Sequence, residues 1–329
     1  MIAQATSVVE LLELVDETWN AEAAAAIEGA GYRYESKALF KVYVVGVLKR
    51  FTSRRALHRY LAGHAEVLTA CGLARLPDRR TLDRRLGAVA AQAEAQIETL
   101  GRLLTVEEVS DGQTVCSDGS AFKARGPRWH QVDKRLGRVP DKLHGLDTDA
   151  DWIYSRYHGW VYGYKAHLSV TVAPTTVRVV VGATVTGACS EARVLAARLD
   201  ALPPTTAILL LDAGYDHPYL LSECQWRGLR TFVPLAKKVG KATPPERRQR
   251  DAELRSPAGK ARFKRRAACI EPFFASLKHT FRLDPLPVRG KAAVSALILL
   301  ACYAWDLIVL SNFCAHRPLG RVLPILEAL

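Results

Sequence analysis

The sequence has few cysteines, and their spacing fits no common cross-link or metal site. Seven cysteines are scattered over 329 residues, without a Cys-x-x-Cys pair or a Cys/His quartet at zinc-site spacing. Because structural zinc sites and disulfide scaffolds depend on such spacings, both classes are excluded. The cysteines that lie in apolar stretches are expected to be reduced core residues of a cytosolic protein.

The first residues, Met-Ile-Ala-Gln-Ala-Thr, lack the basic start and the apolar run of a secretory signal peptide. One apolar stretch, residues 292–311, raises the question of a membrane span. It contains Asp306 and is followed by ordinary amphipathic sequence, so a buried C-terminal helix is the better interpretation. We therefore expect a cytoplasmic protein with no membrane partner.

Acidic residues are outnumbered by basic ones. The chain has 33 Asp and Glu against 46 Lys and Arg, a net charge of +13 and a pI near 9.5. The excess is concentrated in residues 236–291, which hold 16 Lys and Arg against 5 Asp and Glu. Such a field attracts polyanions, and nucleic acid is the usual large polyanion in a cell. A solvated basic surface is the alternative.

Residues 1–105 have the apolar periodicity of helices. Within them, residues 77–85 predict a turn that leads into a basic helix, with Thr81 as its cap and with Arg84 and Arg85 on the helix. A helix-turn-helix that contacts DNA is built in this way, and so are helical hairpins without a DNA role. We predict a helical DNA-binding region over residues 1–105, with Arg84 and Arg85 as DNA contacts.

The pattern changes after residue 105 to short strand-like runs that alternate with helices. Strands are predicted at residues 114–118, 160–172, 177–186, 208–212 and 231–235, and helices at 190–202, 217–227 and around Glu271. Residues 237–266 are basic and turn-rich. The order indicates a mixed sheet with helices on its faces. We predict an α/β fold over residues 106–315, followed by a C-terminal tail over residues 316–329.

Three acidic residues, Asp118, Asp212 and Glu271, lie where these strands end and where the last helix is predicted. Asp118 closes the run 114–118, Asp212 ends the apolar run 207–212, and Glu271 lies on an apolar helical pattern. Carboxylates from two strand ends and one helix can converge on a pair of metal ions that activate water for in-line attack on phosphate. Because no thiolate or imidazole accompanies them, Mg²⁺ or Mn²⁺ is favoured over zinc.

Basic residues accompany the last of these acids. Lys278 follows Glu271 by seven positions, about two helical turns, and therefore lies on the same face of the helix. A cation there can hold a DNA phosphate beside the metal site, and Arg265 and Arg266 could do the same. A solvated helix position is the alternative for Lys278.

Other acids are weaker candidates for the same site. Asp111 precedes the first strand, in the position of a cap or turn residue, and Asp216 lies where Asp-His-Pro indicates a helix start. Either could support a ligand indirectly. Glu253 and Asp284 flank the last acid, but neither lies on the apolar helix with a phase-matched lysine.

Several short motifs, in this order along the chain, resemble those of the DDE transposases of bacterial insertion sequences. They are Ser117-Asp118-Gly119-Ser120, Tyr162-Gly163-Tyr164-Lys165-Ala166-His167, Leu211-Asp212-Ala213-Gly214-Tyr215-Asp216 and Arg266-x4-Glu271-x6-Lys278. The resemblance covers most of the chain and implies a ribonuclease H-like catalytic domain. It also implies that Asp118, Asp212 and Glu271 are the catalytic triad and bind two Mg²⁺ or Mn²⁺ ions.

Two details of these motifs affect the basic candidates. Tyr164 and Lys165 are neighbours on one strand and face opposite sides, so only one of them can face the acidic site; Lys165 is the candidate DNA contact. In the last motif Phe263 replaces a tyrosine of some relatives, and four residues rather than three separate Arg266 from Glu271. This departure affects the role of Arg266 more than that of Glu271.

The resemblance implies a transposase that cuts DNA at transposon ends and transfers the exposed 3′-hydroxyl strand to target DNA. Its partners would be double-stranded DNA, as terminal inverted repeats and as target, and a second copy or more of the chain on that DNA. Its location would be the bacterial cytoplasm, at the nucleoid. Two alternatives stay open: a structure-specific nuclease of the same fold, and a catalytically silent DNA-binding remnant.

Overall fold

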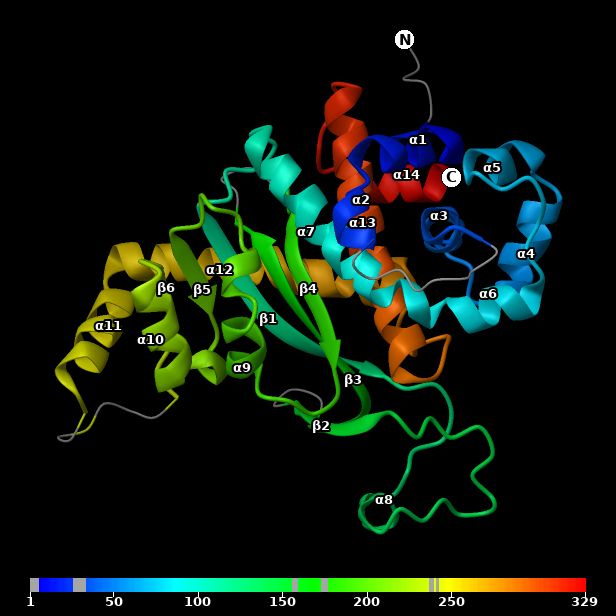
Figure 1. Ribbon diagram of the computed structural model, residues 1–329. Helices are drawn as coiled ribbons and strands as arrows, with labels where there is room; N and C mark the ends of the chain where they lie inside the picture. The colour runs from blue at the N-terminus through cyan, green and yellow to red at the C-terminus, as the bar shows by residue number, and fades with distance from the viewer. Residues whose placement is uncertain (1–5, 26–33, 156–158, 173–176, 237–239, 241–242) are drawn as a thin grey trace.

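A six-stranded mixed sheet lies at the centre of the computed structural model, which describes residues 6–25, 34–155, 159–172, 177–236, 240 and 243–329 (Figure 1). The strands are β1 (Thr114–Lys123), β2 (Asp151–Ser155), β3 (Gly159–Thr171), β4 (Val180–Thr186), β5 (Ile208–Leu211) and β6 (Arg230–Phe232). Of these, β2 was not predicted from the sequence, because its five residues lie within a segment rich in turn-forming residues.

The strand order is β3-β1-β5-β6, and β2 and β4 both pair with β3 along its other edge. Strand β3 runs antiparallel to β1, β2 and β4, whereas β1, β5 and β6 are parallel to one another. Parallel neighbours need crossover connections, which helices supply between β4 and β6. This is the ribonuclease H-like mixed sheet that the resemblance implied, and the predicted fold class is confirmed.

The region before the sheet is helical, as predicted. Its helices are α1 (Val8–Thr18), α2 (Ala21–Ala25), α3 (Ser36–Leu48), α4 (Arg54–Ala62), α5 (Ala65–Ala70), α6 (Arg79–Arg85) and α7 (Ala90–Val106). The predicted cap of the basic helix is wrong. Asp78, not Thr81, caps α6, because its Oδ1 accepts a hydrogen bond of 2.7 Å from the backbone N–H of Arg80.

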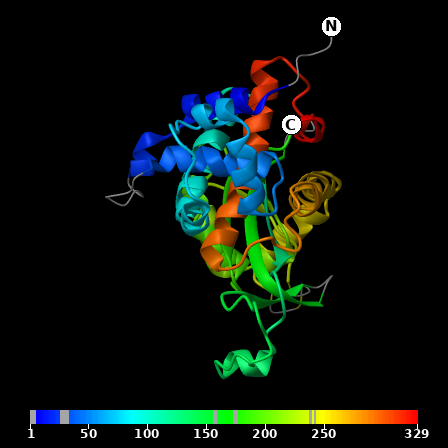
Figure 2. The ribbon, with the colours of Figure 1, turned by 90° about the vertical axis from the view of Figure 1, so that its right-hand side faces the viewer.

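The remaining helices come after β1 along the chain, some of them between later strands. They are α8 (Gln131–Arg135), α9 (Glu191–Ala196), α10 (Pro218–Trp226), α11 (Pro245–Arg255), α12 (Pro257–Ala275), the π-helical turn η4 (Ser276–Thr280), α13 (Lys291–Cys314) and α14 (Val322–Ala328). The segment around α8 projects from the β2 side of the molecule (Figure 1, Figure 2).

The prediction that residues 237–266 are turn-rich is wrong from residue 245 on, because α11 and the first half of α12 lie there; residues 237–239 and 241–242 are outside the described part of the chain. Pro245 and Pro257 occupy the first position of these helices, where a missing N–H costs nothing.

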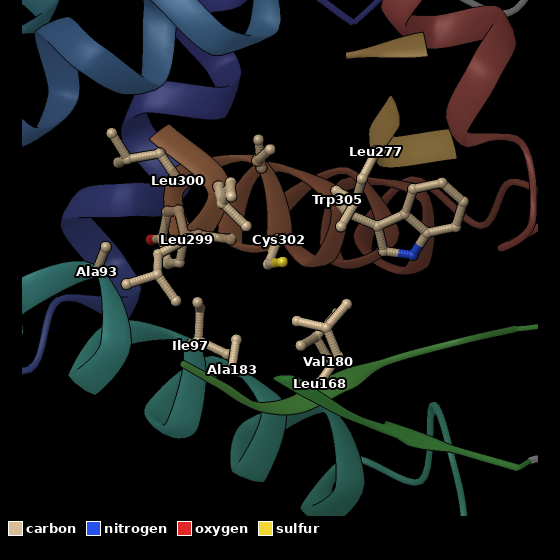
Figure 3. Packing of buried hydrophobic residues seen from close by; sticks show 14 of the residues in the cluster. Ala93, Ile97, Leu168, Val180, Ala183, Leu277, Leu299, Leu300, Cys302 and Trp305 are labelled. Carbon is tan, nitrogen blue, oxygen red and sulfur yellow. The ribbon is translucent and has the colours of Figure 1, made fainter. Parts of the chain in front are cut away.

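Helix α13 lies between the N-terminal helices and the sheet (Figure 3). Its side chains Leu299, Cys302 and Trp305 pack against Ile97 of α7 and the apolar face of β3 and β4. Among the described residues, α13 is the one helix long and apolar enough to cross a membrane, and 83% of its most apolar window is buried inside the protein. Its carboxylate, Asp306, accepts hydrogen bonds of 3.0 and 3.2 Å from the N–H of Val180.

The packing of α7 on β4 leads to a first prediction. A Cβ atom at Gly101 would lie 2.6 Å from the carbonyl oxygen of Val180. We expect Gly101→Ala to lower the free energy of unfolding by about 1–3 kcal/mol, because overpacking must push the backbones apart. In an isolated helix the same change would stabilise by about 1 kcal/mol. Urea denaturation of the wild-type and Gly101→Ala proteins measures the change in the free energy of unfolding.

The matched control is Gly63→Ala, where the nearest atom would be 3.7 Å from the new Cβ and φ is −96°. It should leave stability almost unchanged. If the Gly101→Ala protein were as stable as the wild type, α7 would not pack on β4 at this distance.

Candidate active site

Asp118 and Asp212 lie next to each other because β1 and β5 are parallel neighbours. The last paired residues are Ser117 and Leu211, so Asp118 and Asp212 occupy the next position on each chain. The backbone holds both carboxylates: Asp118 Oδ1 accepts from the N–H of Gly119, and Asp212 Oδ1 from that of Gly214, each at 2.8 Å. Asp118 does not end its strand as predicted, since β1 continues to Lys123.

Arg266 of α12 is the cation nearest to Asp118. Its Nη2 lies 2.7 Å from Asp118 Oδ2, and the two side chains are only 10% and 17% exposed. Arg266 belongs to the buried face of α12, together with Ile270 and Phe273, which turns it toward β1. The extra residue between Arg266 and Glu271 therefore does not keep the guanidinium away from the acidic site.

Burial raises the pKa of Asp118 from 3.8 to about 6. The charge of Arg266 and the N–H of Gly119 oppose this rise, whereas the charges of Asp212 and Glu191 add to it. The pKa of Asp118 is therefore raised despite its contact with Arg266, because the side chain is buried and two further carboxylates lie nearby. Such a site stabilises additional positive charge, and perturbed carboxyl groups of this kind cluster at functional sites.

The sequence prediction missed Glu191, the third carboxylate beside these two aspartates. Glu191 is the first residue of α9 and its side chain is 13% exposed. A Cβ atom at Gly119 would lie 2.7 Å from Glu191 Oε1, and one at Gly214 would lie 2.7 Å from Oε2 and 3.0 Å from Asp212 Oδ1. Two residues without a side chain therefore make room for this carboxylate.

Lys165 is the counter-ion of Glu191. Its Nζ forms an ion pair with Glu191 Oε1, whereas the neighbouring Tyr164 is fully buried and donates to Asp147. Lys165 is thus the residue of this pair that faces the acidic site, as the alternation along β3 required. Burial raises the pKa of Glu191, and the charge of Lys165 opposes that rise.

Glu271 makes no direct contact with this cluster that the described residues show. It is an exposed residue of α12, and no hydrogen bond or ion pair joins it to Asp118 or Asp212 in the part of the chain that the structure describes. Within the same residues, no group of three or more His, Cys, Asp or Glu side chains is arranged to hold a metal ion. The assignment of Glu271 to the triad stays a prediction.

Lys278 lies in the π-helical turn η4, against Ser120, which follows Asp118 by two residues on β1. Its Nζ donates to Ser120 Oγ at 2.8 Å and lies 5.2 Å from the centre of the Phe122 ring. Burial lowers its pKa. Lys278 therefore presents a half-buried ammonium group on the same side of β1 as Asp118.

The two arginines predicted to contact DNA lie far along the chain from these acids, on α6. Arg84 is exposed. Arg85 is half-buried and lies near Tyr43. Burial raises the pKa of the Tyr43 phenol, and the positive charge of Arg85 opposes that rise.

A family model described as a transposase DDE domain matches residues 110–307. The chain belongs to the DDE transposase family. The match begins just before β1, ends within α13, and includes Asp118, Asp212, Glu191 and Glu271. No curated protein and no solved structure gives a significant match. Membership implies a metal-dependent nuclease or transferase that acts on DNA.

The acids of this transposase domain suit the divalent ions that the family uses. Asp118, Asp212 and Glu191 offer only carboxylate oxygens, the donors that Mg²⁺ and Mn²⁺ prefer. In the structure, Arg266 and Lys165 balance two of these three carboxylates. The donor type therefore suits a divalent cation, although in the described residues these carboxylates, paired with Arg266 and Lys165, are not arranged as a ready-made metal site.

The raised pKa of Asp118 predicts how the stability of the transposase depends on pH. Between pH 3.8 and about 6 the folded protein keeps a proton on Asp118 that the unfolded chain has lost. Stability therefore falls as pH rises through this window and stays lower above it. Asp118→Asn removes the buried charge. At about pH 7.5 its free energy of unfolding, measured by urea denaturation, should therefore exceed that of the wild type by at most about 3 kcal/mol.

At about pH 4 the two proteins should be nearly equal in stability, because Asp118 is then largely protonated. Both measurements are made in EDTA. An Asp118→Asn protein that is less stable than the wild type at pH 7.5 would contradict the assignment of a raised pKa.

Glu191 carries a second prediction about the site. We expect Glu191→Gln to slow metal-dependent DNA cleavage at least about tenfold, equal to about 1.4 kcal/mol of barrier. The reason is that the variant removes one of the three carboxylates and frees the ammonium group of Lys165, whose charge then competes with a metal ion beside Asp118 and Asp212. It should also reduce the rise in melting temperature that Mn²⁺ produces.

The control is Glu223→Gln, which removes a carboxylate from a surface ion pair with Arg227 on α10. It should cleave and respond to Mn²⁺ like the wild type. Equal cleavage by the Glu191→Gln and wild-type proteins would remove Glu191 from the site.

Proposed function

We propose that the protein is a transposase that cleaves DNA at transposon ends and transfers the 3′-hydroxyl strand to target DNA. The observation that carries this proposal is the placement of Asp118 and Asp212 side by side on β1 and β5, within the span that matches the family. Both carboxylates are tied to backbone N–H groups, so they are held in place before substrate binds.

Two Mg²⁺ or Mn²⁺ ions would be held by Asp118, Asp212 and Glu271, and they would supply activation of the attacking oxygen and charge neutralisation at the leaving oxygen. Phosphoryl transfer needs little covalent chemistry from protein side chains, so the protein contributes mainly position and charge. Arg266 and Lys165 lie beside the carboxylates and can turn to DNA phosphates. Lys278, next to Ser120, is placed to hold a neighbouring phosphate.

We also infer how the protein works in the cell. Joining two transposon ends requires two active sites, so a dimer or larger assembly on DNA fits the proposed reaction. Its substrates are terminal inverted repeats and target DNA, and its place of action is the nucleoid in the cytoplasm. The net charge of +13 supports binding to DNA.

The test is strand cleavage and joining by the purified full-length protein, with a duplex that carries the inverted repeat flanking its gene and with Mg²⁺ or Mn²⁺. We expect metal-dependent nicking at the repeat boundary and a joined product. Asp212→Asn keeps the shape of the side chain and removes one ligand charge, so it should lose both reactions by several orders of magnitude, while Asp200→Asn, on the surface, should keep them.

Two other outcomes would each support one of the alternative functions. Cleavage without joined product would favour a structure-specific nuclease of the same fold. Specific DNA binding without cleavage in either metal would favour a silent DNA-binding remnant. Glu271→Gln in the same assay tests the third position of the triad, and full activity of that variant would remove Glu271 from it.

A further inference from the structure

Two cations of the protein occupy the carboxylates of the active site. Arg266 Nη2 lies 2.7 Å from Asp118 Oδ2, and Lys165 Nζ forms an ion pair with Glu191 Oε1. The other oxygen of Asp118, Oδ1, accepts from the N–H of Gly119. Both oxygens of Asp118 are therefore engaged, and in the described residues no three His, Cys, Asp or Glu side chains are arranged to hold a metal ion.

These two ion pairs weaken the attraction of the site for a metal ion. With Asp212 the site holds three carboxylates, and the two cations reduce its net charge from −3 to −1. The four paired side chains are only 10–17% exposed, so water screens their charges weakly. A divalent cation that approaches the free protein therefore meets two protein cations that already hold its ligands.

The guanidinium group of Arg266 is only partly satisfied by Asp118. Its Nε is buried and has no hydrogen-bond partner within the part of the chain that the structure describes. A buried donor without a partner is unfavourable. A phosphate group can accept from two nitrogens of a guanidinium group at once, which a single carboxylate oxygen cannot do as well. Arg266 can therefore gain hydrogen bonds when it moves from Asp118 to a DNA phosphate.

Lys165 can leave Glu191 without a change in the backbone. A Cβ atom at Gly119 would lie 2.6 Å from Lys165 Cε and 2.7 Å from Glu191 Oε1, so both side chains cross the space above that glycine. Gly119 directly follows Asp118. Because the lysine stem is flexible, its ammonium group can turn to a phosphate beside Asp118 while the backbone of Lys165 stays paired in β3.

We propose that Arg266 and Lys165 form a latch that keeps the active site from binding metal tightly until DNA is present. In the free protein the latch residues hold Asp118 and Glu191. When DNA phosphates enter the site, both cations move to the phosphates, and the released carboxylates bind Mg²⁺ or Mn²⁺. The inference rests on the proposed function, because it takes DNA as the ligand that opens the latch, and it adds the order in which DNA and metal bind.

The latch couples the two ligands thermodynamically. If DNA raises the affinity of the carboxylates for metal, metal must raise the affinity of the protein for DNA by the same factor. When a latch residue is removed, its carboxylate is free both with and without DNA. The affinity for metal without DNA should then rise, and the coupling between metal and DNA should fall.

The first test measures Mn²⁺ binding by the full-length protein without DNA, from the electron paramagnetic resonance signal of free Mn²⁺. The latch variants are Arg266→Gln and Lys165→Gln. The control is Arg265→Gln, which removes the neighbouring charge of α12, because Arg265 donates to the carbonyl oxygen of Val172. Arg266→Gln leaves a buried carboxylate without its counter-ion, which is destabilising, so Lys165→Gln carries the test if Arg266→Gln does not fold.

Each latch variant should bind Mn²⁺ at least about tenfold more tightly than the wild type, since a competing cation is gone. Mn²⁺ should also raise the melting temperature of each latch variant more than that of the wild type. The Arg265→Gln control should match the wild type in both measurements.

The second test measures the affinity for a fluorescent duplex that carries the inverted repeat, by anisotropy in EDTA and in Ca²⁺ at equal ionic strength. Ca²⁺ takes the same kind of oxygen ligands as Mg²⁺. In the wild type, Ca²⁺ should raise the affinity for DNA at least about fivefold. In each latch variant the ratio of the two affinities should be closer to one, although both affinities fall with the lost phosphate contact.

Three results would overturn the proposal. They are Mn²⁺ binding by the latch variants that is no tighter than that of the wild type, an equal gain in Arg265→Gln, and an effect of Ca²⁺ on DNA binding that is the same in the wild type and the variants. The first test requires neither DNA nor a reaction, so it is separable from the proposed function. Both expected results in a protein that neither cleaves nor joins DNA would refute the transposase but keep the latch. Cleavage and joining by a wild type whose Mn²⁺ affinity equals that of the variants would do the reverse.

Discussion

The parallel pairing of β1 with β5 brings Asp118 beside Asp212, although 93 residues separate them in the sequence. The other groups of the site are placed relative to this pair of strands. Strand β3, on the other side of β1, contributes Lys165, and α12 contributes Arg266. If the register of β1 and β5 changed by one residue, one carboxylate would turn to the opposite face of the sheet, and the acidic pair would be lost.

Charge in the active site is kept close to balance at a cost in stability. Three carboxylates and two cations are partly or wholly removed from water, and the pKa of Asp118 is raised despite its contact with Arg266. Removing charged groups from water is unfavourable unless their interactions compensate for it. A preformed site of this kind trades folding stability for function, and the broad apolar packing of α13 against both helices and sheet offsets the loss.

Helices and strands with a clear hydrophobic period were predictable from the sequence, whereas the burial of individual side chains on them was not. The alternation in β3, the apolar run of β5 and the helical N-terminal region were all predictable. Two tryptophans, whose large apolar rings favour the core, lie at the surface instead: Trp160 is 55% exposed and Trp226 is 80% exposed. An apolar side chain indicates a tendency to be buried, but only its neighbours in space decide whether a partner surface exists.

The sequence by itself determined the mixed α/β class, the positions of Asp118 and Asp212 next to apolar strands, and the basic character of the surface. These follow from local periodicity and composition, which need no knowledge of distant contacts. The tertiary structure decided that Glu191 joins the two aspartates, because that depends on the space above Gly119 and Gly214. It also decided that Arg266 pairs with Asp118 and Lys165 with Glu191, since only the packing of α12 and α9 on the sheet brings residues so far apart in sequence together.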